Sequence, residues 1–60
     1  MYKVEIEYCG MKYTEKYRTK KEVDKRFYGW YYHGLDMVGQ ASSTFTAYDG
    51  HGKVIMNDRY

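Results

Sequence analysis

The stretch that decides the fold is residues 19–33, Thr-Lys-Lys-Glu-Val-Asp-Lys-Arg-Phe-Tyr-Gly-Trp-Tyr-Tyr-His. Its first residue, Thr19, precedes Glu22 by three positions, the spacing of a capping box, in which each side chain bonds a free backbone N–H of the first helical turn. Large apolar side chains then recur at i, i+4, i+7 and i+8, which is one stripe of a helix: Val23, Phe27, Trp30 and Tyr31. The pattern predicts a helix that needs a partner surface.

Glycines leave two places where this helix could end. Gly34 can take the left-handed conformation that ends a helix, and Leu35 could then fold back on Trp30. Continuation to Gly39 would keep Gly29 and Gly34 inside the helix, at a cost of about 1 kcal/mol each relative to Ala. We therefore predict an end at Gly34, with Gly39 as the alternative.

A first hairpin is predicted on the N-terminal side of the helix. Residues 2–8 alternate large apolar with charged side chains, which is the period of a half-buried strand, and residues 11–17 can return beside them. A loop at Cys9-Gly10 places all the large apolar groups on one face. A loop at Gly10-Met11 shifts the partners by two and keeps each side chain on its face, so both registers stay open.

A second hairpin is predicted on the C-terminal side. Residues 44–48 and 53–57 flank the turn sequence Asp-Gly-His-Gly at 49–52. With Gly50 and His51 at the tip, the inner side chains pair as Ala47 with Val54 and Phe45 with Met56. The outer set is then Tyr48, Lys53, Thr46 and Ile55.

The order strand, strand, helix, strand, strand predicts an α+β fold of the ββαββ type. Its simplest closure is a four-stranded antiparallel sheet of two hairpins with one helix packed on one face. Sixty residues make one small domain, so residues 1–60 are expected to form a single unit. Glu15 is the charged residue on the apolar side, and we expect it at the sheet margin, reaching water or a Tyr hydroxyl.

Motifs that would carry catalysis or hold a cofactor are absent from the sequence. The glycines at 29, 34 and 39 match neither a phosphate-binding loop nor a dinucleotide fingerprint. One Cys and two His offer no recognisable zinc spacing, and Cys9 has no sequence-local His or Lys to lower its pKa. We therefore predict that the protein is not an enzyme and binds no cofactor or metal.

Charge and hydropathy restrict the location and the partners. A net charge of +2 is small for a dedicated nucleic-acid binder and has the wrong sign for an acidic DNA mimic. The sequence enters a predicted strand directly after Met1, and no apolar run is long enough for a signal peptide or a membrane span. A single Cys cannot close an intrachain disulfide. We expect a cytoplasmic protein without a membrane partner.

Surplus aromatic side chains on the helix indicate a protein interface. The chain has nine Tyr, two Phe and one Trp, and Tyr and Trp dominate binding energies at interfaces. The candidate anchors for another protein, or for a second copy in a homodimer, are Tyr28, Trp30, Tyr31 and Tyr32. A short, Tyr-rich chain without cofactor motifs also resembles in general character the small inhibitors encoded by phages and mobile elements. That resemblance implies a protein that occludes its target or locks it in an inactive state.

A basic and aromatic stretch, residues 16–28, supports nucleic-acid binding as the alternative. Cations beside aromatic rings suit a phosphate backbone with stackable bases. The candidate cations are Lys16, Arg18, Lys20, Lys21, Lys25 and Arg26. Acidic residues are mixed into the same stretch, and Glu22 with Arg26 is an ordinary i, i+4 pair. A solvated helix face is therefore the default interpretation of these charges.

Overall fold

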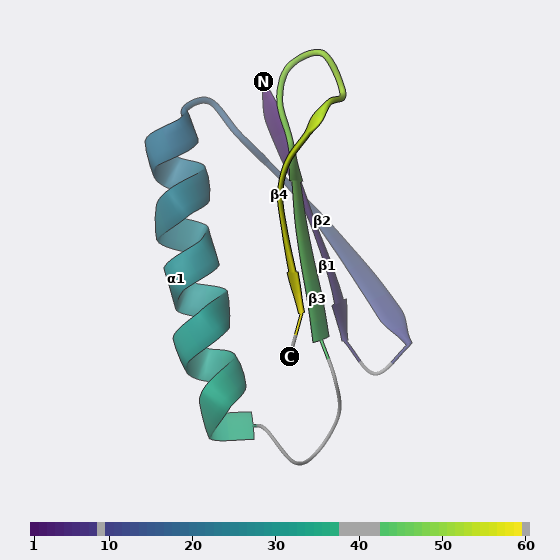
Figure 1. The fold of residues 1–60 in the computed structure, drawn as a ribbon, viewed down its shortest axis with the longest axis vertical. Coiled ribbons are helices and arrows are strands. Elements are labelled where there is room, and N and C mark those ends of the chain that lie inside the picture. The colour runs from purple at the N-terminus through teal and green to yellow at the C-terminus, as the bar shows by residue number, and fades with distance from the viewer. Residues whose placement is uncertain (9, 38–42, 60) are drawn as a thin grey trace.

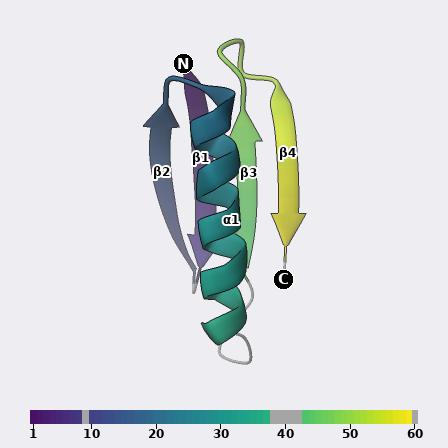
Figure 2. The ribbon, with the colours of Figure 1, turned by 90° about the vertical axis from the view of Figure 1, so that its left-hand side faces the viewer.

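The chain forms two layers, a four-stranded sheet and one helix across it (Figures 1 and 2). The structure, a computed structural model, describes residues 1–8, 10–37 and 43–59, with residues 33–37 described by their backbone alone. The elements are β1 (Tyr2–Tyr8), β2 (Met11–Tyr17), α1 (Lys20–Met37), β3 (Ser43–Tyr48) and β4 (Val54–Arg59). All pairings are antiparallel and the strand order is β2-β1-β3-β4. The predicted α+β fold of the ββαββ type is confirmed.

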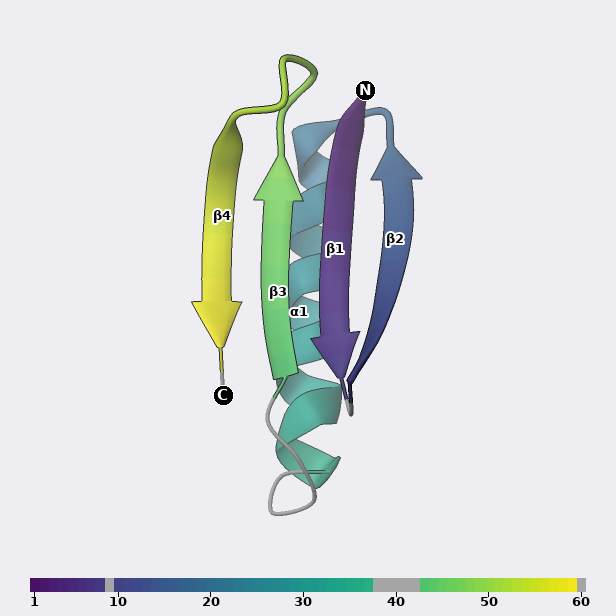
Figure 3. The ribbon, with the colours of Figure 1, turned by 90° about the vertical axis from the view of Figure 1, so that its right-hand side faces the viewer.

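The two hairpins join through their first strands, so β1 and β3 are central and β2 and β4 form the edges (Figure 3). In the first hairpin Tyr8 is opposite Met11 and Ile6 is opposite Tyr13, which selects the register with its loop at residues 9 and 10. Gly10 has a φ of 76°, a left-handed value that glycine adopts without a steric cost. Cys9 lies outside the described residues.

The register predicted for the second hairpin is wrong. Ala47 is opposite Met56 rather than Val54, and the pairing shifts by one residue between Ala47 and Tyr48, so that Tyr48 is opposite Val54. Ile55 is the extra residue, and it packs against the core instead of lying on the outer face. Such a bulge bends an edge strand and changes the face of a side chain.

The turn of this hairpin is longer than the predicted two-residue tip. The Asp49 carboxylate accepts hydrogen bonds from the backbone N–H groups of Lys53 at 2.9 Å and His51 at 2.8 Å. The Asp49 N–H also donates to the Lys53 carbonyl at 2.9 Å, which closes the turn around five residues. The two hydrogen bonds to the carboxylate hold the pKa of Asp49 below its usual value, and the bond from Lys53 is the larger cause.

The helix starts where the sequence predicts. Glu22 Oε1 accepts the Thr19 backbone N–H at 3.1 Å, and Thr19 Oγ1 accepts the Glu22 backbone N–H at 3.2 Å, which completes the capping box. The predicted end at Gly34 is wrong, because α1 continues to Met37. A glycine costs about 1 kcal/mol inside a helix, which weakens a packed and capped helix without ending it. The expected Leu35 contact and the alternative end at Gly39 lie outside what the structure describes.

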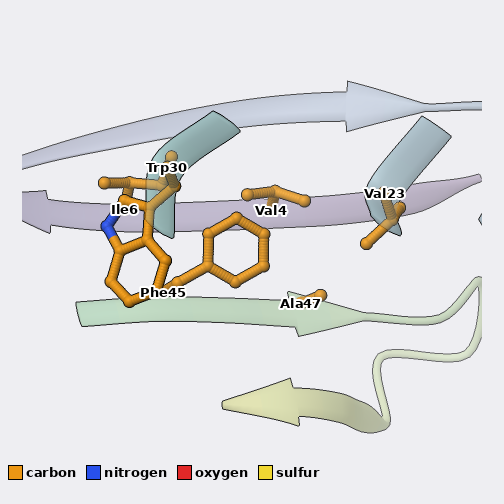
Figure 4. Close-up of a cluster of buried hydrophobic side chains, with 6 residues drawn as sticks. All are labelled: Val4, Ile6, Val23, Trp30, Phe45 and Ala47. Carbon is orange, nitrogen blue, oxygen red and sulfur yellow. The ribbon is translucent and has the colours of Figure 1, made fainter. Parts of the chain in front are cut away.

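The core lies between α1 and the two central strands (Figure 4). Its buried side chains are Val4, Ile6, Val23, Trp30, Phe45 and Ala47. The ring of Phe45 lies 5.2 Å from Phe27 and 5.3 Å from Trp30, measured between centroids. Three residues of the predicted apolar stripe, Val23, Phe27 and Trp30, therefore pack on the sheet, whereas Tyr31 is 39% exposed and lies outside this cluster.

A buried chain of hydrogen bonds fixes the helix to both central strands. Trp30 Nε1 donates to Ser43 Oγ at 2.8 Å, and Ser43 Oγ donates to the Glu7 carbonyl oxygen at 2.8 Å. Ser43 is only 6% exposed, so its hydroxyl has little access to water. The serine satisfies a buried donor and a strand-end carbonyl together, which links α1, β3 and β1.

We expect Ser43→Ala to lower the free energy of unfolding by about 1–3 kcal/mol, because the buried indole N–H of Trp30 loses its acceptor. Urea denaturation followed by Trp30 fluorescence measures the change. Thr44→Ala, the next position on the same strand, is the control. Equal losses in the two variants would contradict the role given to the serine.

We expect Thr19→Ala to destabilise the protein by about 1 kcal/mol, because the first turn loses its side-chain cap. Thr19→Ser keeps the hydroxyl and should retain most of the stability. Thermal unfolding followed by circular dichroism compares the two. A serine variant as unstable as the alanine variant would show that the cap is not the cause.

Candidate functional site

One side of α1 faces away from the sheet and carries two exposed tyrosines. At 3.6 residues per turn, Lys21, Lys25, Tyr28 and Tyr32 lie within about 60° of one another, opposite the buried Val23. Tyr28 is 58% exposed and Tyr32 is 61% exposed. Both lysines are exposed as well. We call these four residues the outward stripe; in Figure 2 this side of the helix faces the viewer.

Neighbouring rings hold the tyrosines in place. Tyr28 and Tyr32 stack with 6.3 Å between centroids and 18° between planes. Tyr31 meets Tyr32 edge-on at 5.4 Å and stacks on Phe27 at 6.2 Å, and Phe27 packs against the core. Rings already ordered in the free protein lose little conformational entropy on binding. Tyr28, Tyr31 and Tyr32 thus form one connected aromatic surface beside Lys21 and Lys25.

Trp30, the fourth predicted protein-binding residue, lies apart from the three tyrosines. Its side chain is 6% exposed, and its indole N–H bonds Ser43. It packs on Phe27 and Phe45, with centroids 5.6 and 5.3 Å away. The structure therefore places Trp30 in the core, and we leave it out of the candidate surface.

The six predicted nucleic-acid-binding cations do not gather on one surface. Lys16 is the cross-strand partner of Lys3 on the open face of the sheet, away from the helix. Arg18 lies in the connection between β2 and α1. Lys20 forms an ion pair of 3.0 Å with Asp24 on the helix. The remaining three, Lys21, Lys25 and Arg26, divide between the outward stripe and the sheet edge.

Arg26 contacts the sheet edge through the carboxylate that the sequence leaves unexplained. Its Nε donates to Glu15 Oε1 at 2.8 Å, and the Tyr17 hydroxyl donates to the same oxygen at 2.7 Å. The expectation that Glu15 lies at the margin and reaches a Tyr hydroxyl is confirmed. The expected Glu22–Arg26 pair does not form, because Glu22 caps the helix and Arg26 bonds Glu15.

The open face of the sheet, which is turned to the viewer in Figure 3, carries a polar network of its own. Tyr48 Oη donates to Glu5 Oε1 at 2.8 Å, and Lys3 Nζ lies 3.8 Å from Glu5 Oε2 and 4.7 Å from the Tyr48 ring centre. The hydrogen bond to Glu5 is the main reason why the pKa of Tyr48 is raised. The polar groups at the middle of this face are therefore engaged with one another.

Neither a metal cluster nor a membrane span is found in the part of the chain that the structure describes. Among the side chains that the structure describes, those of residues 1–8, 10–32 and 43–59, no three of the His, Cys, Asp or Glu types come together as metal ligands. No helix in residues 1–8, 10–37 and 43–59 has the length and apolar character that crossing a bilayer needs. The comparisons with known proteins give no match to a family model, a curated protein or a solved structure.

Two features of the structure are not predicted from the sequence. Lys21 and Lys25 share a helix side with Tyr28 and Tyr32. The spacing of these four residues, by four, three and four positions, is the sequence pattern that indicates a common helix side. Ser43 belongs to a strand and to the core, although the sequence places it in a polar connection. No local pattern distinguishes a buried serine from a loop serine.

Alkaline pH should test the contact between Tyr17 and Glu15. Burial, followed by the hydrogen bond to Glu15 and its negative charge, raises the pKa of Tyr17 above the ordinary value of 10.0. The unfolded chain therefore loses this proton at lower pH than the folded protein. The stabilisation that the Tyr17 hydroxyl contributes is fully present below the pKa of Tyr17 in the unfolded chain. It is lost as the pH rises through the higher pKa of Tyr17 in the folded protein.

We expect Tyr17→Phe to be less stable than the natural chain by about 1 kcal/mol at about pH 8, and the difference to shrink towards about pH 11. Urea denaturation across this range measures both proteins. Tyr13→Phe is the control, because the Tyr13 hydroxyl contacts the Met11 sulfur and, among the described side chains, no carboxylate. A constant difference between Tyr17→Phe and the natural chain at every pH would count against the assignment.

Proposed function

We propose that this chain is a non-enzymatic protein-binding module that binds its partner through the outward stripe and Tyr31. The observation that carries the proposal is the exposure of Tyr28 and Tyr32, at 58% and 61%, on the helix side opposite the core. Folding gains little from rings in that position. Exposed, ordered tyrosines are typical of interfaces, where they supply contact area and a hydroxyl together.

The proposed mode of action is inhibition of a target protein. The chain of 60 residues has principal extents of 34 × 20 × 14 Å. A protein of this size is suited to cover one functional surface of a target protein or to stabilise the inactive state of that target. The general likeness to small inhibitors of phages and mobile elements supports the same interpretation. The proposal places the protein in the cytoplasm, where a lone cysteine needs no disulfide partner.

Nucleic-acid binding is the second candidate, and one observation favours it. Lys21, Lys25 and Tyr28 line a shallow, open depression on the helix together with Thr19, Glu22 and Asp24. Two cations beside an exposed ring could contact a phosphate and stack a base. Two acidic groups in the same depression and the pairing of Arg26 with Glu15 weaken that arrangement, so protein binding is the stronger candidate.

Alanine at both Tyr28 and Tyr32 should remove most of the binding to a partner protein, because truncating a central interface tyrosine typically costs about 2 kcal/mol or more. Immobilised protein is exposed to lysate of its source organism, and the captured proteins are compared by mass spectrometry. The control is Met11→Ala with Tyr13→Ala, two residues that are 57% and 48% exposed on the edge strand β2. Equal capture by the two double variants would refute the proposed surface.

Salt dependence separates protein binding from nucleic-acid binding. If nucleic acid is the partner, a mobility shift should appear with short single-stranded DNA or RNA and should weaken steeply as salt rises. Lys21→Ala with Lys25→Ala should then abolish the shift. We expect no shift at physiological salt, and a salt-sensitive shift that needs both lysines would replace the protein-binding proposal.

A further inference from the structure

The outward stripe has the spacing of a helix-pairing seam. Lys21, Lys25, Tyr28 and Tyr32 are separated by four, three and four residues, the 4-3-4 spacing that keeps side chains facing a partner helix in coiled coils. The order along this seam is two lysines followed by two tyrosines. Cations therefore occupy its N-terminal half and rings its C-terminal half.

This order makes the stripe complementary to itself in one orientation. When two copies of α1 run antiparallel about a two-fold axis, Lys21 faces Tyr32 of the second copy and Lys25 faces Tyr28 of the second copy. Every lysine then meets a ring, and a cation over a Tyr face is attracted by its quadrupole. A parallel arrangement would bring lysines against lysines. We propose that the outward stripe binds a second copy of this chain in this antiparallel, two-fold symmetric arrangement.

Contacts within the chain support lysine–tyrosine pairing. Lys3 Nζ lies 4.7 Å from the Tyr48 ring centre, so the same two residue types already meet on the open face of the sheet. Lys20 pairs with Asp24 and Arg26 with Glu15, whereas no acidic side chain among the described residues pairs with Lys21 or Lys25. The Tyr28 and Tyr32 rings are already stacked in parallel, which presents them together to an approaching helix.

The inference deepens the proposed function and rests on it, since it names a second copy as a protein partner of the same surface. A single pair of helices buries less than the roughly 800 Å² per partner of a standard interface, so the dimer should be weak. A weak dimer would cover the tyrosines at high concentration and release them to a tighter target. The target and the second copy would then compete for one surface.

Sedimentation velocity over about 10 μM to about 1 mM tests the dimer, because a small interface associates only at such concentrations. The natural chain should change from monomer to dimer across this range. Lys21→Glu with Lys25→Glu should weaken the dimer at least about tenfold, because carboxylates then face tyrosine rings. Lys12→Glu with Lys16→Glu, which makes the same charge change on β2, should leave the dimer unchanged.

A second variant tests the orientation. Tyr28→Glu with Tyr32→Glu places two lysines before two glutamates, so antiparallel copies would form lysine–glutamate pairs at every position. Parallel copies would instead repel. The variant should dimerise more weakly than the natural chain, because exposed ion pairs contribute less than buried rings, and its dimer should dissociate further as salt rises, because exposed ion pairs are screened. Circular dichroism checks that each variant keeps its fold.

Three results would overturn the inference. These are a natural chain that stays monomeric at every concentration, a lysine-to-glutamate variant that dimerises as tightly as the natural chain, and a tyrosine-to-glutamate variant whose self-association strengthens as salt rises, which is the behaviour of parallel copies. A monomeric natural chain whose capture of a partner still needs Tyr28 and Tyr32 would remove the dimer and leave the proposed function intact. A natural chain that dimerises, but whose capture of lysate proteins does not depend on Tyr28 and Tyr32, would refute the proposed function and leave the dimer intact.

Discussion

The packing of Phe45 against Phe27 and Trp30 is the contact on which the rest of the structure depends. Phe45 is fully buried in the central strand β3, and its ring lies within 5.3 Å of both helix rings, between centroids. This contact sets which side of α1 faces the sheet. It also brings the Trp30 indole to Ser43, so the polar link to β1 forms where the apolar packing places it. Burial and hydrogen bonding thus select the same helix orientation, as minimally frustrated folds require.

That orientation divides the surface of the protein into two unlike faces. The open face of the sheet has Glu5 bonded by Tyr48 and approached by Lys3, so its central polar groups satisfy one another. The opposite surface is the outer side of α1, where Tyr28 and Tyr32 stack on each other and reach solvent. A two-layer protein needs only one side of its helix for the core. Rings on the other side are therefore free to serve an interaction.

Local patterns in the sequence predict most of the fold. Alternation in residues 2–8, the capping box and the i, i+4, i+7 stripe each depend on neighbours in the chain, and all three features are present. The features that sequence reasoning missed depend on tertiary contacts or small energy differences. The bulge at Ile55 adjoins a turn that Asp49 side-chain bonds hold, and the helix end depends on about 1 kcal/mol per glycine. The part of the candidate site that was predictable is the tyrosine set, and the helical stripe already indicates that Trp30 faces the sheet. No local pattern indicates the hydrogen bond of Trp30 to Ser43.

The ion pairs decide the chemical character of the candidate surface. In the sequence, residues 16–28 are a basic stretch with interleaved rings, but folding turns Arg26 to Glu15 and pairs Lys20 with Asp24. What remains on the outward stripe is Lys21 and Lys25 beside two tyrosines. This surface is aromatic with two flanking cations, rather than a basic surface with occasional rings. A partner must therefore match the ring faces first, because a buried tyrosine contributes more binding energy than an exposed ion pair.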